Sequence, residues 1–197
     1  VAAVPFDRCL GVGRPCELLA PTEWLSESLP TRLDGTVSDD ATIEGDVVVE
    51  PGATVKAGVT IEGPAYIGRG ATIGPNAYIR GATAIGANAN VGHAVEIKNS
   101  VLLSDATVGH LSYVGDSILG RGVNFGAGTT VANLRHDDEP VELTVKGDRV
   151  STGRRKFGVV VGDNAKTGIN TSLNAGVVVG TEMTTTPGEV LTRDRRE

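Results

Sequence analysis

Aliphatic residues recur at every sixth position over much of the chain. From Val37, twelve consecutive positions at this spacing hold Val, Ile or Leu: Val37, Ile43, Val49, Val55, Ile61, Ile67, Ile73, Ile79, Ile85, Val91, Ile97 and Leu103. The residue two places before each of them is usually small or short, and the residue after is often Gly or acidic. The period differs from that of an α-helix, in which apolar residues recur every three to four residues.

A period of six fits a short strand followed by a tight corner. The aliphatic side chain would point into a narrow prism, and glycine would supply corner backbone angles that other residues resist. Three such faces make one coil of about 18 residues, and coils stack at the interstrand spacing of roughly 4.8 Å. The pattern predicts an all-β fold, a parallel β-helix over residues 33–197, although periodicity alone does not give its hand.

The repeat shifts twice and breaks once. It slips by one residue after Leu103, resumes at Val108 and slips again before Leu119, and such slips predict bulged corners. Residues 134–156 are charged and aperiodic, so we expect an excursion loop there, with residues 141–145 and the region of Val150 forming an external hairpin. The period then returns at Val161, Thr167, Leu173, Val179, Thr185 and Leu191.

The first 32 residues lie outside the repeat. Pro21–Leu25 is a candidate short helix, with Thr22 as its N-cap and Glu23 in its first turn. We expect this segment to cover the open end of the solenoid, where unpaired strand edges would otherwise be exposed.

Composition narrows the class of protein. The chain has 27 glycines and only 4% aromatic residues, so Val, Ile and Ala must fill its core, as in repetitive β folds. The net charge is −6 without a basic stripe, which argues against a nucleic-acid partner. Cys9 and Cys16 form neither a disulfide framework nor a zinc pattern. No apolar run or signal peptide indicates a membrane, and we expect a cytoplasmic protein.

Three motifs resemble one enzyme family. They are VEIKNS at 95–100, GHLSYVGD at 109–116 and VNFGAGT at 123–129. In this order and spacing they resemble the acetyltransferase half of the bifunctional sugar-1-phosphate nucleotidylyltransferase/acetyltransferases, of the glucosamine-1-phosphate N-acetyltransferase type. ANLR at 132–135, GRRK at 153–156 and GDN at 162–164 are similar to the archaeal branch.

The resemblance covers residues 33–194 and implies a left-handed β-helix that forms homotrimers with active sites between subunits. It implies transfer of the acetyl group of acetyl-CoA to an amino-sugar 1-phosphate. Glucosamine 1-phosphate is the expected acceptor, and galactosamine 1-phosphate stays open. Residues 11–19 look like the end of the family's nucleotidyltransferase domain. We therefore interpret residues 1–32 as a linker or remnant of that domain, and expect no uridyltransferase activity.

The same resemblance implies roles for individual residues. His110 would be the general base, the usual task of histidine near neutral pH, and Glu96 a residue that orients its imidazole or else a solvated corner carboxylate. Arg80 and Lys98 would bind the phosphate. The remaining sugar contacts would be Tyr113, Asn124 and Lys156, and the acetyl-CoA contacts would be Ala127, Asn133, Leu134, Ile169 and Pro187.

Spacing alone supports part of this site. Arg80 and Lys98 are one coil apart, so they should lie on one face in adjacent coils, where two cations repel unless an anion separates them. His93 precedes His110 by nearly one coil and should lie beneath it. His136 falls in the excursion and should be solvated.

Three other functions stay open. The chain would be a non-catalytic scaffold or regulatory subunit if the site were inert, or it would acetylate another sugar. A sugar nucleotide would require an added base pocket. A zinc-dependent γ-carbonic anhydrase needs three converging histidines, which the spacing of the histidines in this chain disfavours. Acetyl transfer as interpreted here requires no metal.

Overall fold

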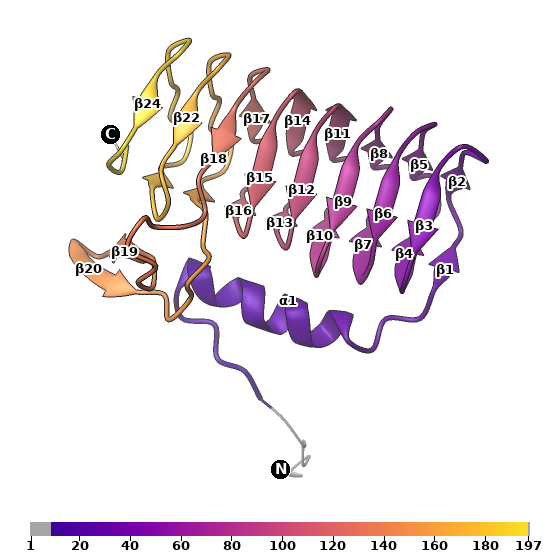
Figure 1. The fold of residues 1–197 in the computed structure, drawn as a ribbon, viewed down its shortest axis with the longest axis horizontal. Coiled ribbons are helices and arrows are strands. Elements are labelled where there is room, and N and C mark those ends of the chain that lie inside the picture. Colours follow the sequence, from indigo (N-terminus) through magenta and orange to yellow (C-terminus); the bar gives the residue numbers. More distant parts are fainter. Residues whose placement is uncertain (1–8, 197) are drawn as a thin grey trace, which may run out of the picture.

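The aliphatic pattern forms short parallel strands that wind into a three-sided solenoid in the computed structural model, which describes residues 9–196. Successive coils stack along one axis. Within each coil the chain runs along the three faces of the prism in turn, which are called sheets B, C and A (Figure 1). This winding is left-handed. The predicted fold, a left-handed parallel β-helix, is confirmed.

Three parallel sheets make up the faces of the prism among the described residues. Sheet A holds β1 (Arg32–Leu33), β4 (Val47–Val49), β7 (Ala65–Ile67), β10 (Thr83–Ile85), β13 (Val101–Leu102), β16 (Ile118–Leu119), β21 (Val160–Val161) and β23 (Val178–Val179). Sheet B holds β2 (Thr36–Val37), β5 (Thr54–Val55), β8 (Thr72–Ile73), β11 (Asn90–His93), β14 (Thr107–His110) and β17 (Asn124–Phe125). Sheet C holds β3 (Thr42–Glu44), β6 (Thr60–Glu62), β9 (Tyr78–Arg80), β12 (Glu96–Lys98), β15 (Tyr113–Gly115), β18 (Thr130–Val131), β22 (Ser172–Leu173) and β24 (Val190–Leu191).

Ladders of aliphatic side chains fill the prism. Ile61, Ile79 and Ile97 stack in register on sheet C, and each is 0% exposed. Burial of such a side chain stabilises the fold by about 1.5–3 kcal/mol. Polar residues that occupy core positions of the repeat in the last coils also point inward. The hydroxyl groups of Thr167 and Thr129 form a hydrogen bond of 2.8 Å, so the buried oxygen of Thr167 has a partner.

One predicted core position is wrong by one residue. Leu102, not Leu103, continues the aliphatic ladder: it is 1% exposed and lies between Ile85 and Leu119. The slip therefore falls before this residue, at the corner from β12 to β13, which is one residue shorter than the preceding corner. At the shortened corner the Ser100 hydroxyl accepts the backbone N–H of Ser117 at 3.0 Å and continues the stacking.

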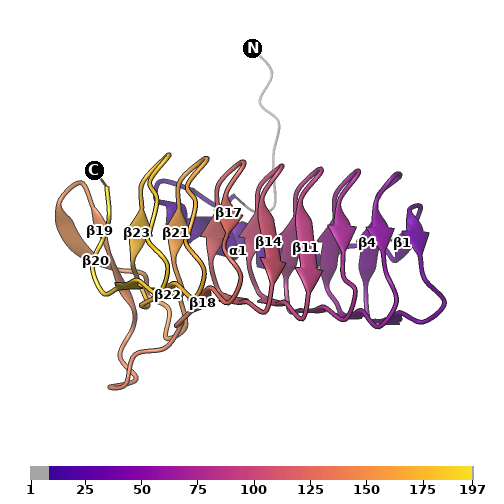
Figure 2. The ribbon, with the colours of Figure 1, turned by 90° about the horizontal axis from the view of Figure 1, so that it is seen from above.

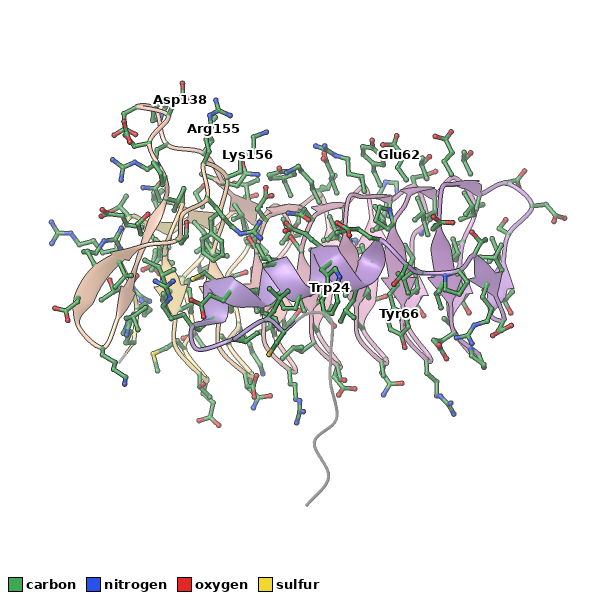
Figure 3. The ribbon with its side chains drawn as sticks, turned by 90° about the horizontal axis from the view of Figure 1, so that it is seen from below. Trp24, Glu62, Tyr66, Asp138, Arg155 and Lys156 are labelled. Carbon is green, nitrogen blue, oxygen red and sulfur yellow. The ribbon has the colours of Figure 1, made fainter. Side chains whose placement is uncertain are left out.

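The N-terminal helix lies elsewhere than predicted. A 3₁₀ turn, η1 (Pro15–Leu18), leads into α1 (Leu19–Ser26), and both lie along the outer face of sheet A instead of across the end of the solenoid (Figures 1 and 3). Thr22 is inside the helix and donates to the Leu18 carbonyl at 2.8 Å, so it is not the N-cap. Apolar positions explain the location, because Leu19 is 1% exposed against sheet A.

The predicted excursion and its hairpin are confirmed. The chain leaves sheet C after β18, forms the antiparallel pair β19 (Glu142–Val145) and β20 (Asp148–Ser151), and re-enters at β21 in sheet A. Figure 2 shows the hairpin beside the last coils. Leu143 and Phe157 are buried in a second apolar cluster with Leu19 over Val101 and Ile118 of sheet A. The helix and the hairpin thus cover sheet A.

Candidate active site

Three of the predicted phosphate and sugar residues, Arg80, Lys98 and Tyr113, lie in two polar rows on the outer face of sheet C. Lys98 lies opposite Arg80 in the parallel register, which confirms the placement predicted from their spacing. Glu96 lies opposite Tyr113 of the next coil. Because outward residues alternate with the core ladder along each strand, these side chains share one face.

Arg80 is already paired with a carboxylate. Its Nε and a terminal nitrogen lie 2.8 and 2.7 Å from Glu96 Oε1, and its guanidinium lies 5.6 Å from the Tyr78 ring centroid. The hydrogen bond to Glu96 raises the pKa of Arg80. Glu96 contacts Arg80 here, and its prediction as the residue that orients His110 stays a prediction.

Lys98 is held by a buried aspartate, Asp116, at the corner from sheet C to sheet A. Lys98 Nζ lies 2.9 and 2.8 Å from the two Asp116 oxygens. The same carboxylate accepts from Asn99 Nδ2 at 3.1 Å and from Asn133 Nδ2 at 2.5 Å. Asp116 is 3% exposed and has a φ of 52°, a conformation that aspartate tolerates better than most residues. It is the centre of the polar network on this face.

Tyr113 joins this network through Asn133. The Asn133 amide donates to the Tyr113 hydroxyl at 3.1 Å and to Asp116. Burial, and then the negative charge of Asp116, raises the pKa of Tyr113, so its hydroxyl stays protonated around neutral pH. The Asn133 amide therefore holds Tyr113, which is predicted to contact the sugar. Asn133 itself is a predicted acetyl-CoA contact.

His110 occupies a different part of the surface, the corner between sheets B and C. It is exposed at the end of β14 and lies opposite His93, as the spacing predicted. The next coils place three predicted acetyl-CoA contacts in the same column, because Gly128 N bonds the His110 carbonyl, Asn170 N bonds that of Ala127 and Gly188 N bonds that of Ile169. The equivalent corner positions of the column are His93, His110, Ala127, Ile169 and Pro187.

The remaining predicted residues lie on other faces or segments. Asn124 is exposed at the start of β17 in sheet B, opposite Thr107. Lys156 lies at the end of the excursion, where its backbone pairs with Leu134. Its side chain projects to the same side of the solenoid as Glu62 of sheet C, away from α1 (Figure 3). One chain thus gathers Arg80, Lys98, Tyr113 and Asn133 but leaves Asn124 on another face.

No cluster of three metal-binding side chains exists among residues 9–196, and no helix in that range is long and apolar enough to cross a bilayer. A cavity of about 680 Å³ opens between the excursion and the last coils, lined by residues that include Leu134, His136 and Arg193. It does not reach the His110 column.

The site contains residues that sequence reasoning did not select. Asp116 lies 18 residues after Lys98 and 17 after Asn99, so counting one coil onward from either residue would have identified it. Glu23 also contacts this network through Asn99 and pairs with Arg154, which is 131 residues away, and no spacing rule joins the two.

The fold and the corner column define a hexapeptide-repeat β-helix protein. A family model described as the GMPPB C-terminal domain matches residues 61–159. The chain belongs to this family.

Curated relatives confirm the resemblance to the bifunctional enzymes. "Bifunctional protein GlmU" of Methanococcus vannielii is 47% identical over 169 residues, which are 86% of this chain and 41% of the relative. The "bifunctional sugar-1-phosphate nucleotidylyltransferase/acetyltransferase" of Sulfurisphaera tokodaii is 42% identical over 186 residues, 94% of this chain and 46% of the relative. The chain thus spans less than half the length of these two relatives.

Among solved structures, a hexapeptide transferase family protein from Anaplasma phagocytophilum aligns with a TM-score of 0.42 and 16% identity. The alignment covers 79% of this chain and 71% of the other.

Proposed function

We propose that this chain transfers the acetyl group of acetyl-CoA to the amine of an amino-sugar 1-phosphate, with glucosamine 1-phosphate as the acceptor. The observation that carries the proposal is the exposed His110 in one column with Ala127 and Ile169, at the corner from which the chain enters sheet C. The names of the relatives, which include nucleotidylyltransferase/acetyltransferase, support the same reaction.

In this reaction the sugar nitrogen attacks the thioester carbon, the carbon–sulfur bond breaks, and CoA leaves as the thiol. His110 would take the proton from the attacking nitrogen and return it to the sulfur, which is the role of a general acid–base residue in acyl transfer. The backbone N–H of Ala127 donates to no backbone acceptor among the described residues. It is therefore free to bond the thioester oxygen as negative charge develops there.

Sheet C would bind the sugar phosphate. Arg80 and Lys98 are each neutralised by a carboxylate of the chain, so a phosphate must share or displace these partners. The Lys156 side chain, in contrast, has no ion-pair or hydrogen-bond partner among residues 9–196, and it extends to this side of the molecule (Figure 3). We assign it the first electrostatic contact with the phosphate.

We further propose a homotrimer. Helix α1 and the excursion cover sheet A, while the candidate residues lie on sheets B and C. Asn124 and Tyr113 occupy different faces of one prism, so a neighbouring subunit is needed to bring such residues together. Three-fold assembly suits a three-sided subunit. We expect this reaction in the cytoplasm, and we expect it to require neither a metal, a nucleic acid nor a membrane.

The test is release of free thiol from acetyl-CoA in the presence of glucosamine 1-phosphate at near-neutral pH. The unaltered protein should release thiol, and His110→Ala should lose about 100-fold or more in rate. His136→Ala, an exposed histidine of the excursion, is the matched control and should stay within about twofold of the unaltered rate.

Parallel assays with galactosamine 1-phosphate and a UDP-amino sugar identify the acceptor. Preference for a UDP-amino sugar would replace the proposed substrate class. If protein that has been shown to be trimeric releases no thiol with any acceptor, the hypothesis of an enzyme is overturned and that of a scaffold is favoured.

A further inference from the structure

Glu23 of helix α1 connects the N-terminal segment to two other parts of the chain. Its carboxylate accepts two hydrogen bonds from Arg154, both at 2.7 Å, and one from Asn99 Nδ2 at 3.0 Å. Arg154 belongs to the end of the excursion, and Asn99 to the corner from sheet C to sheet A. The paired geometry is the strong form of the arginine–carboxylate contact.

Asn99 carries this connection into the polar network. Its amide nitrogen donates both to Glu23 and to Asp116, and Asp116 in turn holds Lys98 and Asn133. The contacts therefore run from the helix to the candidate substrate site without a gap.

Arg154 carries the connection to Lys156, two residues further along the chain. The backbone of this stretch is attached to the solenoid on one side, through the Leu134–Lys156 bridge and the bond from Phe157 N to the Asn133 carbonyl at 3.0 Å. The ion pair of Arg154 with Glu23 attaches it on the other side. Lys156 thus extends from a segment held at both flanks.

The charges around this ion pair are consistent with it. Arg154 lowers the pKa of Glu23 through its hydrogen bond, and Lys98 adds to this effect. Glu23 and then Asp116 raise the pKa of Arg154 against the opposing effect of burial.

We propose that Glu23 is a positioning residue of the acetyl-transfer site, which fixes the segment bearing Lys156 through Arg154 and the Asp116 network through Asn99. This inference rests on the proposed function. It makes the segment before the solenoid a part of the substrate site, although that segment contributes no side chain to the reacting groups.

The kinetic test compares Glu23→Gln with Glu27→Gln in the full chain. Glu27 is exposed one turn further along and has no side-chain partner among the described residues, so it is the matched control. Glu23→Gln should raise the KM for glucosamine 1-phosphate roughly three- to tenfold and leave kcat within about twofold, because it disorders a binding segment and not the base. Arg154→Gln should do the same, and the double variant should add nothing to the larger single effect.

Amide hydrogen exchange over residues 152–158 gives a second readout that does not depend on catalysis. Exchange should be faster in Glu23→Gln and Arg154→Gln than in the unaltered protein and in Glu27→Gln. An unchanged KM in an active Glu23→Gln protein would overturn this inference alone. So would additive single effects or unchanged exchange. An unaltered protein without activity would overturn the proposed function, and the positioning role would fall with it even if exchange responded.

Discussion

At the scale of single residues, the backbone of the coil next to His110 leaves no room for a side chain at Gly92. A Cβ on Gly92 would lie 1.9 Å from the Gly109 carbonyl oxygen, whereas a Cβ on Gly109 would meet nothing within 4 Å. These two glycines precede His93 and His110 and face each other in adjacent coils. The position of the imidazole therefore depends on close contact between the two strands.

We predict that Gly92→Ala separates β11 from β14 and reduces acetyl transfer by at least tenfold, since small displacements of a catalytic group are costly. Gly109→Ala, the matched control, should fold and retain activity. Rates of thiol release, measured on both purified variants, test this prediction. Equal activity of the two variants would contradict the predicted displacement.

Asp116 has a different role, because it satisfies three partners from a buried position. We predict that Asp116→Ala lowers the free energy of unfolding by about 2–4 kcal/mol, since it leaves the largely buried Lys98 ammonium unpaired. Asp105→Ala controls for backbone strain: Asp105 has a similar φ of 62° but is exposed. Urea denaturation measures both, and an equal loss in the two variants would assign the effect to the backbone.

At the scale of elements, helix α1 and the excursion form an added layer over sheet A. Their apolar contacts include Leu19 and Phe157, and their main polar contact is the Glu23–Arg154 pair. This layer leaves sheets B and C uncovered, and those are the sheets that carry the candidate site.

The Glu23–Arg154 pair gives stability a defined pH dependence. The pKa of Glu23 lies below its ordinary value of 4.5 in the folded protein. Its contribution to stability is therefore fully present above the unfolded pKa and is lost as the pH falls through the lowered folded pKa. We predict that Glu23→Gln is less stable than the unaltered protein at pH 7 and that the difference disappears as the pH falls from the unfolded pKa through the lowered folded pKa of Glu23. Thermal unfolding at several pH values measures this, and a difference that grows on acidification would refute it.

The sequence predicted the solenoid well because each coil repeats the same local rule. Aliphatic steps such as Ile61 and Ile79 must point inward, so counting by six identifies the core and counting by a coil places Lys98 beside Arg80. The same counting failed at Leu103, since a corner can close with one residue fewer without changing the pattern nearby. The location of α1 and its contact with Arg154 depend on tertiary packing between distant segments, which no period records.

The candidate site was predictable in part for the same reason. The column from His110 to Ala127 follows from coil spacing, whereas the pairing of Arg80 with Glu96 depends on side-chain conformations. Two cations one coil apart need negative charge nearby, and the chain supplies it with Glu96 beside Arg80 and Asp116 beside Lys98. The interpretation of Arg80 and Lys98 as a phosphate site therefore stays a prediction.

At the scale of the whole molecule, the separation of Asn124 from Tyr113 and Lys98 offers a test of the proposed homotrimer, in which a second subunit supplies the missing face. We predict that Asn124→Ala and Lys98→Ala are each nearly inactive alone. When they are co-expressed, mixed trimers should regain activity, because some clefts then receive an intact face from each chain. Co-expressed His110→Ala and Asn124→Ala, both altered on the sheet B side, provide the comparison. A mixture no more active than its components would show that the site is built within one chain.

The most direct measurement is the mass of the sugar product after incubation of the protein with acetyl-CoA and glucosamine 1-phosphate. We predict that the sugar phosphate gains one acetyl group on its nitrogen with the unaltered protein, and that His110→Ala yields about one hundredth as much or less in the same time. Unmodified sugar from the unaltered protein, or equal product from His110→Ala, would contradict it.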